Sequence, residues 1–386
     1  MTLPQFDPVA FALVCVPALS VLVLWRAWRL RIIGTQFECD ETVYVHQARV
    51  SSGGLGRYRW LIRTYLGERT AWSCPPPSRY GWILPVALLT RWRPGNPHAL
   101  FVSLSAIGAA ACVPLSCVIG WQLGGPIVGT IAAALSAGSA LTRGMGRRGL
   151  QDTWVAALEL GLVAAALSGW WPAIAVLTFL LLATKETGVV FVVLAIGLDV
   201  LLHGRHPVPL ALSYALPAAA WLLVGGWLMG GLRMWWQVYR CMTVGVLPSS
   251  SAYSRDYGQG GARRALVDFV ILSPVHVLAF VSVMAGVTWR TPAVLGVAMV
   301  GTLLVLVHAV LMAGFTVRHV LVADQLIRIV AALYLALEVL SGNWLGALVV
   351  AALMVVADYK AWHALDRGPV HDPITARLVR YFDMAP

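Results

Sequence analysis

Long apolar segments separated by short polar gaps recur along most of the chain. A transmembrane helix needs about 20 consecutive apolar residues, and this rule predicts about ten to eleven spanning helices. The predicted spans are 8–25, 97–121, 124–142, 150–168, 170–184, 186–203, 207–230, 266–288, 292–313, 319–340 and 343–360. The pattern therefore predicts an all-α polytopic membrane protein, with residues 1–386 forming a single transmembrane domain.

Two long connections, residues 34–96 and 231–265, interrupt this series of spans. Both are rich in Arg, Tyr and Trp, which favour the membrane interface. Neither has the periodic apolar pattern of a soluble domain, and no soluble C-terminal domain is expected. Within the first connection, 41–51 is predicted to be a short interfacial helix that Asp40 caps and that the following glycine pair ends.

The composition supports the membrane interpretation and limits the partners. The chain is 59% hydrophobic and 12% charged, whereas a soluble domain is about 25% charged. No basic residue precedes the apolar segment 9–25, and "WRAWRLR" follows it, so it is expected to be a retained helix. The net charge is +11. The arginines of the chain are scattered through its loops. This distribution favours lipid headgroups over nucleic acid as the partner of the positive charge.

Alternation of the spans places the ionisable loop residues at one face of the membrane. If residues 34–96 lie on one face, the gaps 142–149, 184–186, 231–265 and 314–319 lie on the same face. We call this face X. The opposite face receives only short connections. Because loops commonly carry functional residues, the asymmetry predicts a single reaction site on face X.

Three carboxylates are candidates for chemistry there. Asp40 and Glu41 are adjacent in "FECDETVYVHQA". A carboxylate near the membrane surface can act as a general base, although helix capping would also explain the pair. Asp152 opens a span in "RRGLQDTW". It either orients a cation or the acceptor, or it complements the helix dipole and pairs with Arg148.

The same face also receives the candidate cations. Arg147 and Arg148 precede a span, Lys185 lies at a helix junction in "LLATKETG", and Arg318 and His319 begin another span. For Lys185, snorkelling to the membrane surface is the structural alternative. Acids and cations together suit attack of a hydroxyl on a lipid-phosphate-linked sugar, since cations stabilise the leaving phosphate.

Other polar residues have structural explanations. Asp324 and Arg328 lie four residues apart inside a span and are expected to pair. Cys15, Cys112 and Cys117 lie in apolar segments and are expected to be core residues. The cysteine spacing contains no CxxC pair, so a zinc site is not expected.

At these motifs the chain resembles the GT-C glycosyltransferases, and within them the protein O-mannosyltransferase and aminoarabinose transferase branch. The matching elements are the acidic pair of "CDETVYVHQA", the prolines of "CPPPSRYGW", then "RRGLQDTW", "LLATKETG" and the Arg-His pair near 318. The resemblance covers about residues 30–340. Cys74 stands where the family has a His before the prolines. The Trp-Trp-Asp signature of oligosaccharyltransferases is absent.

The resemblance implies a role for each candidate. Asp40 corresponds to the catalytic base, with Glu41 as its neighbour and Asp152 as a further catalytic residue. The implied donor-phosphate ligands are Arg147, Arg148, Lys185, Arg318 and His319. The implied substrate groove is formed by Tyr44, Pro76, Trp235, Trp236 and Tyr239. No nucleotide sugar, cofactor or obligatory metal is implied, and a divalent metal remains an open alternative.

The implied activity is that of an inverting, mannosyltransferase-like enzyme of the cell envelope. It would transfer a sugar from a polyprenyl-phosphate donor to a hydroxyl of a lipid, glycan or protein. The implied location is a bacterial plasma membrane, with face X toward the periplasm or exterior. The arginines of face X, Arg26, Arg29 and Arg31 among them, conflict with this orientation under the positive-inside rule.

Three questions stay open at the level of sequence. A transporter or flippase of an anionic lipid is one alternative, although transporters usually show repeats and broken helices at the midplane. A non-catalytic assembly subunit with the same fold is another. Cys39 and Cys74 either form a disulfide across the first connection or remain two thiols.

Overall fold

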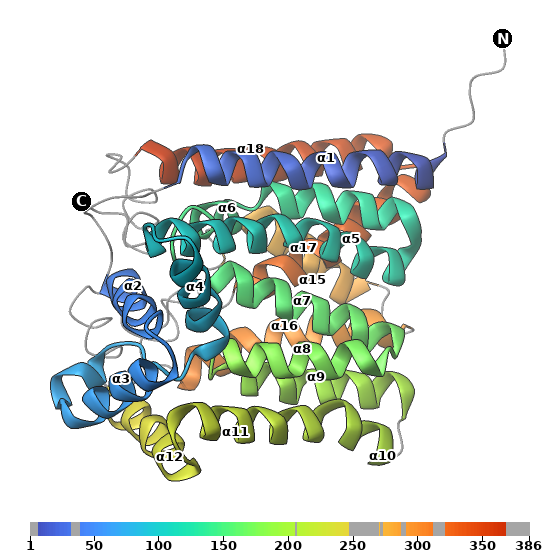
Figure 1. The fold of residues 1–386 in the computed structure, drawn as a ribbon. Helices are drawn as coiled ribbons and strands as arrows, with labels where there is room; N and C mark the ends of the chain where they lie inside the picture. Colours follow the sequence, from blue (N-terminus) through green and yellow to red (C-terminus); the bar gives the residue numbers. More distant parts are fainter. Residues whose placement is uncertain are drawn as a thin grey trace.

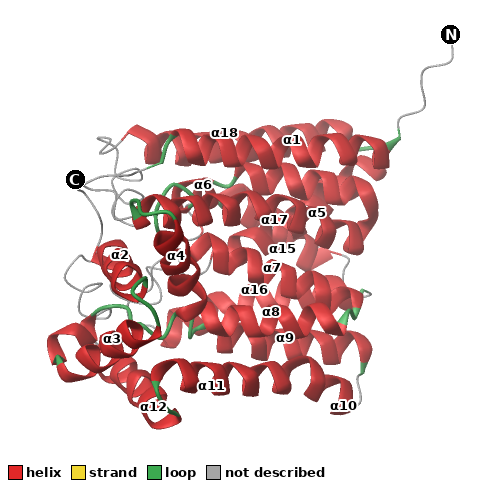
Figure 2. Ribbon diagram, viewed as in Figure 1, coloured by secondary structure: helices red, strands yellow, loops and turns green. Residues whose placement is uncertain are grey.

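The computed structural model describes residues 7–31, 39–204, 207–246, 270, 273–286, 291–311 and 321–367. Within these ranges the regular elements are helical and no strand occurs (Figure 2). The helices are α1 Pro8–Arg29, α2 Cys39–Ser51, α3 Leu55–Gly67, η1 Arg69–Ser73, α4 Tyr80–Trp92, α5 Pro97–Gly138, α6 Ala140–Met145, α7 Asp152–Ser168, α8 Trp171–Thr184, α9 Gly188–His203, α10 Pro207–Leu210, η2 Ala211–Ala215, α11 Leu216–Met229, α12 Leu232–Cys241, η3 Met242–Val246, α15 Pro274–Gly286, α16 Pro292–Leu311, α17 Leu321–Leu340 and α18 Trp344–Arg367. The prediction of an all-α protein is confirmed.

The long helices run roughly side by side in stacked rows (Figure 1). Helices α1 and α18 form one edge of the bundle, and α11 forms the opposite edge. Helices α5, α7 and α17 lie between them, and α17 is buried along most of its length. The short helices α2, α3, α4 and α12 gather at one end, which is therefore face X (Figure 1).

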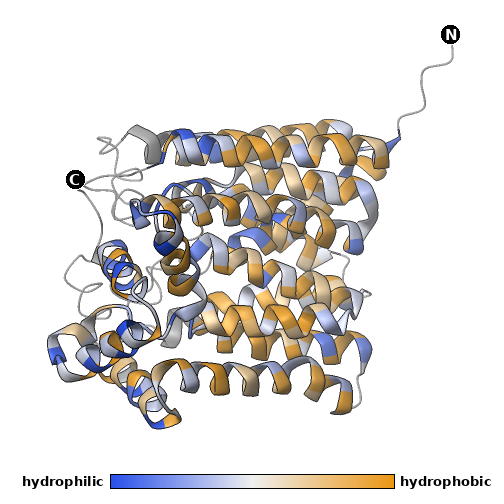
Figure 3. Cartoon of the chain, in the orientation of Figure 1, coloured by the Kyte–Doolittle hydropathy of each residue, from blue (hydrophilic) through white to orange (hydrophobic). Residues whose placement is uncertain are grey.

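Apolar residues dominate the long helices, whereas polar residues gather toward their ends and on α2 and α3 (Figure 3). Among the described residues, four segments are long and apolar enough to cross a membrane by length and composition. They are Pro8–Arg29, Pro97–Gly138, Pro207–Met229 and Trp344–Trp362. Shorter apolar helices accompany them at Trp171–Thr184, Gly188–His203, Pro274–Gly286 and Pro292–Val307. This distribution is that of an integral membrane protein.

Helix α5 contains two of the predicted spans, because the chain reverses within it. Gly124 and Gly125 depart from helical geometry, and Gly125 has a φ of +84°, which favours glycine. A Cβ on Gly120 would lie 3.0 Å from the Cα of Gly129. In a straight helix these residues would be about 13 Å apart, so the two halves of α5 form a tight hairpin.

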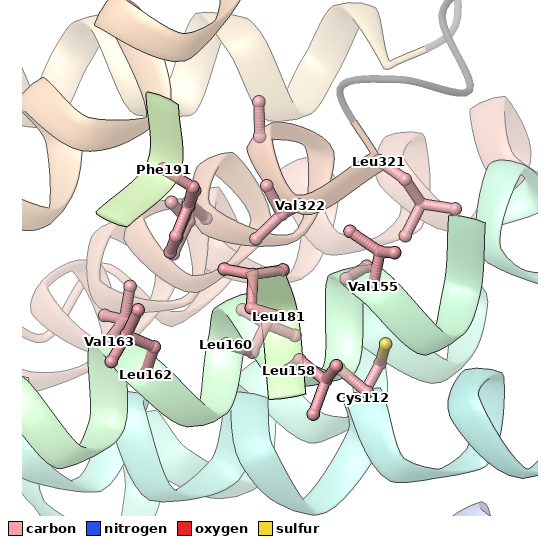
Figure 4. Close-up of a cluster of buried hydrophobic side chains, with 14 of the residues drawn as sticks. Cys112, Val155, Leu158, Leu160, Leu162, Val163, Leu181, Phe191, Leu321 and Val322 are labelled. Atoms are coloured by element: carbon pink, nitrogen blue, oxygen red, sulfur yellow. The ribbon is translucent and has the colours of Figure 1, made fainter. Parts of the chain in front are cut away.

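The core joins α7 to the helices around it. Figure 4 shows Val155, Leu160, Leu181, Phe191 and Val322 converging from α7, α8, α9 and α17, and all five are buried. Small residues bring other helices to backbone contact. A Cβ on Gly108 of α5 would lie 2.6 Å from the backbone nitrogen of Trp154 on α7. Close backbone approach of this kind is typical of helix packing in membranes.

The connections contain more helix than the sequence predicted. The predicted helix 41–51 is present as α2. This helix begins at Cys39, so Asp40 lies in its first turn, and the prediction that Asp40 caps the helix is wrong. Helices α3, α4 and α12 were not located in advance. Their apolar residues are spaced for one buried face, as Tyr58, Leu61, Ile62 and Tyr65 show on α3.

Candidate active site

Glu41 is the anchor that fixes α2 to the bundle. Its side chain is 2% exposed. One carboxylate oxygen accepts a hydrogen bond from Arg148 Nη2 at 3.1 Å, and the other accepts from the backbone N–H of Gly149 and lies 3.4 Å from His98 Nε2. Burial alone would raise the pKa of Glu41, but the hydrogen bond with His98, the charge of Arg148 and the Gly149 N–H lower it to about 2. Glu41 is therefore a carboxylate that stays ionised.

Asp40, next to this anchor, has a different environment. Its side chain is only half-buried. Its charge acts on the Tyr44 hydroxyl and on the Arg79 guanidinium, so both groups lie within its electrostatic reach. The two adjacent carboxylates therefore differ. Glu41 is enclosed and bound by Arg148, while Asp40 borders a cluster of polar groups at face X.

Arg79 links four segments of that cluster. It follows the three prolines of "CPPPSRYGW", and its side chain is largely buried. Its Nε lies 2.9 and 3.0 Å from the two carboxylate oxygens of Glu186, and its Nη1 donates to the hydroxyl of Tyr44. The amide of Gln151, oriented to satisfy both neighbours, accepts from Arg79 Nη1 at 3.0 Å and donates to the Thr184 carbonyl at 3.1 Å.

Lys185 and Asp152 form a buried ion pair beside this cluster. Lys185 Nζ donates to Asp152 Oδ1 at 2.8 Å, and the two residues are each 6% exposed. The alternative that Lys185 snorkels to the surface is therefore wrong, because the side chain turns inward from the junction of α8 and α9. The neighbouring Glu186 binds Arg79, so this junction supplies one cation and one acid to the site.

The predicted groove residues fall into two groups. Tyr44 and Pro76 are both buried, and the Tyr44 hydroxyl accepts a hydrogen bond from Arg79. Trp235 and Tyr239 of α12 stack with ring centroids 4.2 Å apart. The charge of Glu186 reaches Tyr239, so this stack borders the site. Trp236 is 65% exposed.

The predicted phosphate ligands are likewise divided. Arg148 is bound to Glu41. Arg147 Nε donates to the carbonyl of Leu30 at 2.9 Å, at the C-terminal end of α1. Arg318 and His319 lie outside the described residues. Lys185 is therefore the predicted cation that the structure places beside Asp152, and the roles of the others remain predictions.

A second polar network is centred on Arg328, which is 1% exposed. The predicted pair is confirmed, with Arg328 Nε 2.9 Å from Asp324 Oδ2. The network is larger than predicted, because Nη1 and Nη2 also donate to Asp358 at 2.8 Å each. Ser273 and His276 contact the same guanidinium at 3.0 and 3.1 Å. These residues join α15, α17 and α18.

Metal and disulfide chemistry stay at the level of prediction. In the part of the chain that the structure describes, no group of three or more His, Cys, Asp or Glu side chains is arranged to hold a metal ion. The side chain of Cys39 lies outside the described residues, so its pairing with Cys74 is not tested. The core assignment is confirmed for Cys112 and Cys117, which are buried, while Cys15 is half-buried.

Sequence reasoning missed Arg79, His98 and Gln151. Arg79 stands inside a motif that was considered only for its prolines, and its partner Glu186 is 107 residues away. His98 is 57 residues from Glu41. An arginine shortly after a rigid proline segment was the available signal, since proline restricts the backbone and limits the directions that the next side chains can take.

The described helices and their apolar spans define a class, the polytopic all-α membrane proteins. Among solved structures the chain is similar to ArnT from Cupriavidus metallidurans in the apo state. The two structures superpose with a TM-score of 0.58 at 13% sequence identity. The match covers 98% of this chain and 75% of the ArnT chain. The structure of ArnT from the same organism bound to undecaprenyl phosphate gives a TM-score of 0.48 at 15% identity. That match covers 96% of this chain and 74% of the ArnT chain. No family model and no curated protein matches the sequence. The likeness to apo ArnT confirms the predicted fold.

Proposed function

We propose that the protein is an inverting glycosyltransferase that transfers a sugar from a polyprenyl-phosphate donor to a hydroxyl acceptor at face X. The observation that carries the proposal is the cluster of Asp40, the Tyr44–Arg79 pair and the Asp152–Lys185 pair at that end of an ArnT-like bundle. Acids and cations alternate within it beside the membrane boundary. This arrangement suits a lipid-anchored phosphate.

The proposal gives the two adjacent carboxylates separate roles. Glu41, with a pKa of about 2 and three bound neighbours, holds α2 in place and is a weak base. Asp40 is the proposed base. The acceptor oxygen attacks the anomeric carbon of the sugar, and Asp40 takes the proton of the hydroxyl. The bond from this carbon to the phosphate oxygen breaks, polyprenyl phosphate leaves, and the anomeric configuration inverts.

The cations stabilise the negative charge that develops on the leaving phosphate. Lys185 is the first proposed ligand, because Asp152 holds its ammonium at 2.8 Å inside the cluster. Arg79 is the second, and it is oriented by Glu186 and Tyr44. Arg318 and His319 are proposed to complete the phosphate site, as the resemblance implies. Arg148 supports the reaction through Glu41.

The proposed setting is a bacterial plasma membrane with face X toward the periplasm or exterior. The proposed partners are a polyprenyl-phosphate sugar, a lipid, glycan or protein acceptor, and the surrounding membrane lipids. ArnT, whose apo form shares this fold, has also been solved with undecaprenyl phosphate, so this lipid is a suitable first probe.

The test is a transfer assay with the purified full chain in lipid nanodiscs. Undecaprenyl phosphate carrying labelled mannose or aminoarabinose is supplied with extracted envelope lipids, glycans or proteins. Release of undecaprenyl phosphate coupled to labelled acceptor supports the proposal. Asp40→Asn is expected to abolish transfer while donor binding survives, since only proton removal is lost. Glu68→Gln, an exposed acid after α3, is the matched control and should retain the wild-type rate. Full activity of Asp40→Asn would reject the assignment of the base.

A further inference from the structure

Two arginines that the proposed reaction does not use share one indole ring. The guanidinium carbons of Arg26 and Arg143 lie 4.0 and 4.5 Å from the ring centroid of Trp362. These residues come from α1, α6 and α18, and α1 and α18 both lie at one edge of the bundle (Figure 1). Two like charges therefore stand close together at the face-X end of this edge, and a shared anion would relieve their repulsion.

The same surface continues along the end of α1. Arg29 lies 5.3 Å from the ring of Trp25, and Arg31 lies 4.5 Å from the ring of Trp28. Both arginines are exposed. Stacking engages the flat face of a guanidinium and leaves its in-plane N–H groups to donate to oxygens. Among the described residues, no carboxylate forms an ion pair with Arg26 or Arg29.

Among the described acids, one whose charge interacts with Arg143 is already engaged. Asp358 of α18 lies within electrostatic reach of Arg143. However, its two oxygens each accept from Arg328 at 2.8 Å, so most of its charge is offset there. Arg147 adds another cation nearby, because its Nε binds the Leu30 carbonyl at the end of α1. Arg26 and Arg29 therefore give this surface a positive charge at the depth of the lipid headgroups.

Apolar side chains extend from this charged end toward the middle of the bundle. On α1, Val21 and Leu22, within two turns of Arg26, are 64% and 41% exposed. On α18, Leu348 and Val355 are 67% and 64% exposed. Figure 3 shows apolar residues along most of both helices and polar residues toward this end. A ligand that fits both parts has a phosphate head and long acyl chains.

We propose that Arg26, Arg29, Arg143 and Trp362 form a binding site for the phosphate headgroup of an anionic phospholipid in the face-X leaflet. The lipid phosphate accepts charge-assisted hydrogen bonds from the guanidinium groups, and its acyl chains cover the exposed apolar sides of α1 and α18. Bound in this way, it stabilises the contact between these two helices. None of its residues belongs to the donor site proposed above.

The test is native mass spectrometry of the full chain in detergent, titrated with phosphatidylglycerol or with phosphatidylcholine of the same acyl chains. Wild-type protein is expected to bind phosphatidylglycerol about 10-fold more tightly than phosphatidylcholine. Arg26→Gln/Arg29→Gln is expected to lose about 10-fold in affinity for phosphatidylglycerol and little for phosphatidylcholine. The matched control is Arg91→Gln/Arg93→Gln, which removes two exposed arginines around Trp92 at the end of α4 and should bind as wild type does.

Two further measurements keep the proposal falsifiable if the double variant does not fold. In wild-type protein, about 0.5 M salt should remove most of the preference for phosphatidylglycerol, since screening weakens exposed charge contacts. Inorganic phosphate should compete weakly. Equal binding of the two lipids by wild-type protein would overturn the proposal. An equal loss in the control variant, or full competition by inorganic phosphate, would overturn it as well.

Discussion

The ammonium of Lys185 and the carboxylate of Asp152 lie 2.8 Å apart, with both residues 6% exposed. A buried ion pair gains its attraction in a low-dielectric setting but loses the hydration of both ions. It is therefore a weak source of net stability and a strong constraint on position. Each partner fixes where the other can be, which suits a site that must hold a cation against a lipid phosphate.

Lys185→Met is expected to destabilise the protein more than Asp152→Asn/Lys185→Met. The single variant leaves a buried carboxylate without its cation, which costs about 3–5 kcal/mol. The double variant removes both charges and should recover part of that loss. Thermal unfolding in detergent measures the difference. Lys360→Met, which changes an exposed lysine of α18, is the control and should unfold as wild type does. Equal unfolding temperatures for the single and double variants would contradict the pairing.

Arg79→Lys should lower both stability and transfer, although it keeps the positive charge. A lysine cannot donate to Glu186, Tyr44 and Gln151 with the planar geometry of the guanidinium. Loss of each charge-assisted contact is expected to cost about 1.5–3 kcal/mol. The measurements are the unfolding temperature and kcat/KM. Arg91→Lys, at an exposed position, should change neither quantity. Wild-type stability in Arg79→Lys would show that this network does not hold the site together.

Acid should destabilise the wild-type protein through Glu41. The pKa of this group is about 2 in the folded protein, below its ordinary value of 4.5. A depressed folded pKa gives stability that is present above pH 4.5 and is lost as the pH falls toward 2. The loss amounts to about 3 kcal/mol at full protonation. Glu41→Gln should be less stable at neutral pH and should show a smaller further loss between pH 4.5 and 2.

Unfolding temperatures at a series of pH values test this expectation. Glu68→Gln, which removes an exposed carboxyl, should leave the wild-type acid dependence unchanged. If Glu41→Gln and wild-type protein lose stability in parallel, Glu41 does not carry the acid dependence.

Gly108→Ala is expected to destabilise the packing of α5 on α7. Its Cβ would lie 2.6 Å from the Trp154 backbone nitrogen and 2.8 Å from the Thr153 carbonyl carbon. Overpacking of this kind typically costs about 1–3 kcal/mol. Gly197→Ala is the control, since no atom lies within 4 Å of the Cβ that it adds. The unfolding temperature of Gly108→Ala should be well below that of Gly197→Ala. Equal unfolding temperatures would reject the close approach of α5 and α7.

The spanning helices were predictable because the membrane imposes a length on apolar segments. Even the hairpin in α5 was predictable, since the gap between the predicted spans 97–121 and 124–142 lies directly before Gly124 and Gly125. Helices α3 and α12 were harder to locate. They are amphipathic and short, and their arginines and aromatic residues also occur in interfacial loops.

The candidate site was predictable by region and not by role. Alternation of the spans brought Asp40, Glu41, Asp152 and Lys185 to the same face. It could not distinguish Asp40 from Glu41, because neighbours in sequence have the same composition around them. His98 and Arg148 make the distinction, and they are 57 and 107 residues from Glu41. Contacts at such separations arise from the packing of whole helices, which no local pattern contains.

The network around Arg79 also bears on how the protein is made. Its described members, from Asp40 to Glu186, all come from the first half of the 386-residue chain. Chains are synthesised from the N-terminus, and early segments can begin to fold before later ones exist. The described segments that contribute to this network are therefore synthesised before α15, α16, α17 and α18 have been translated. The later helices then enter the membrane after the helices on which they pack, such as α5 and α7 for α17.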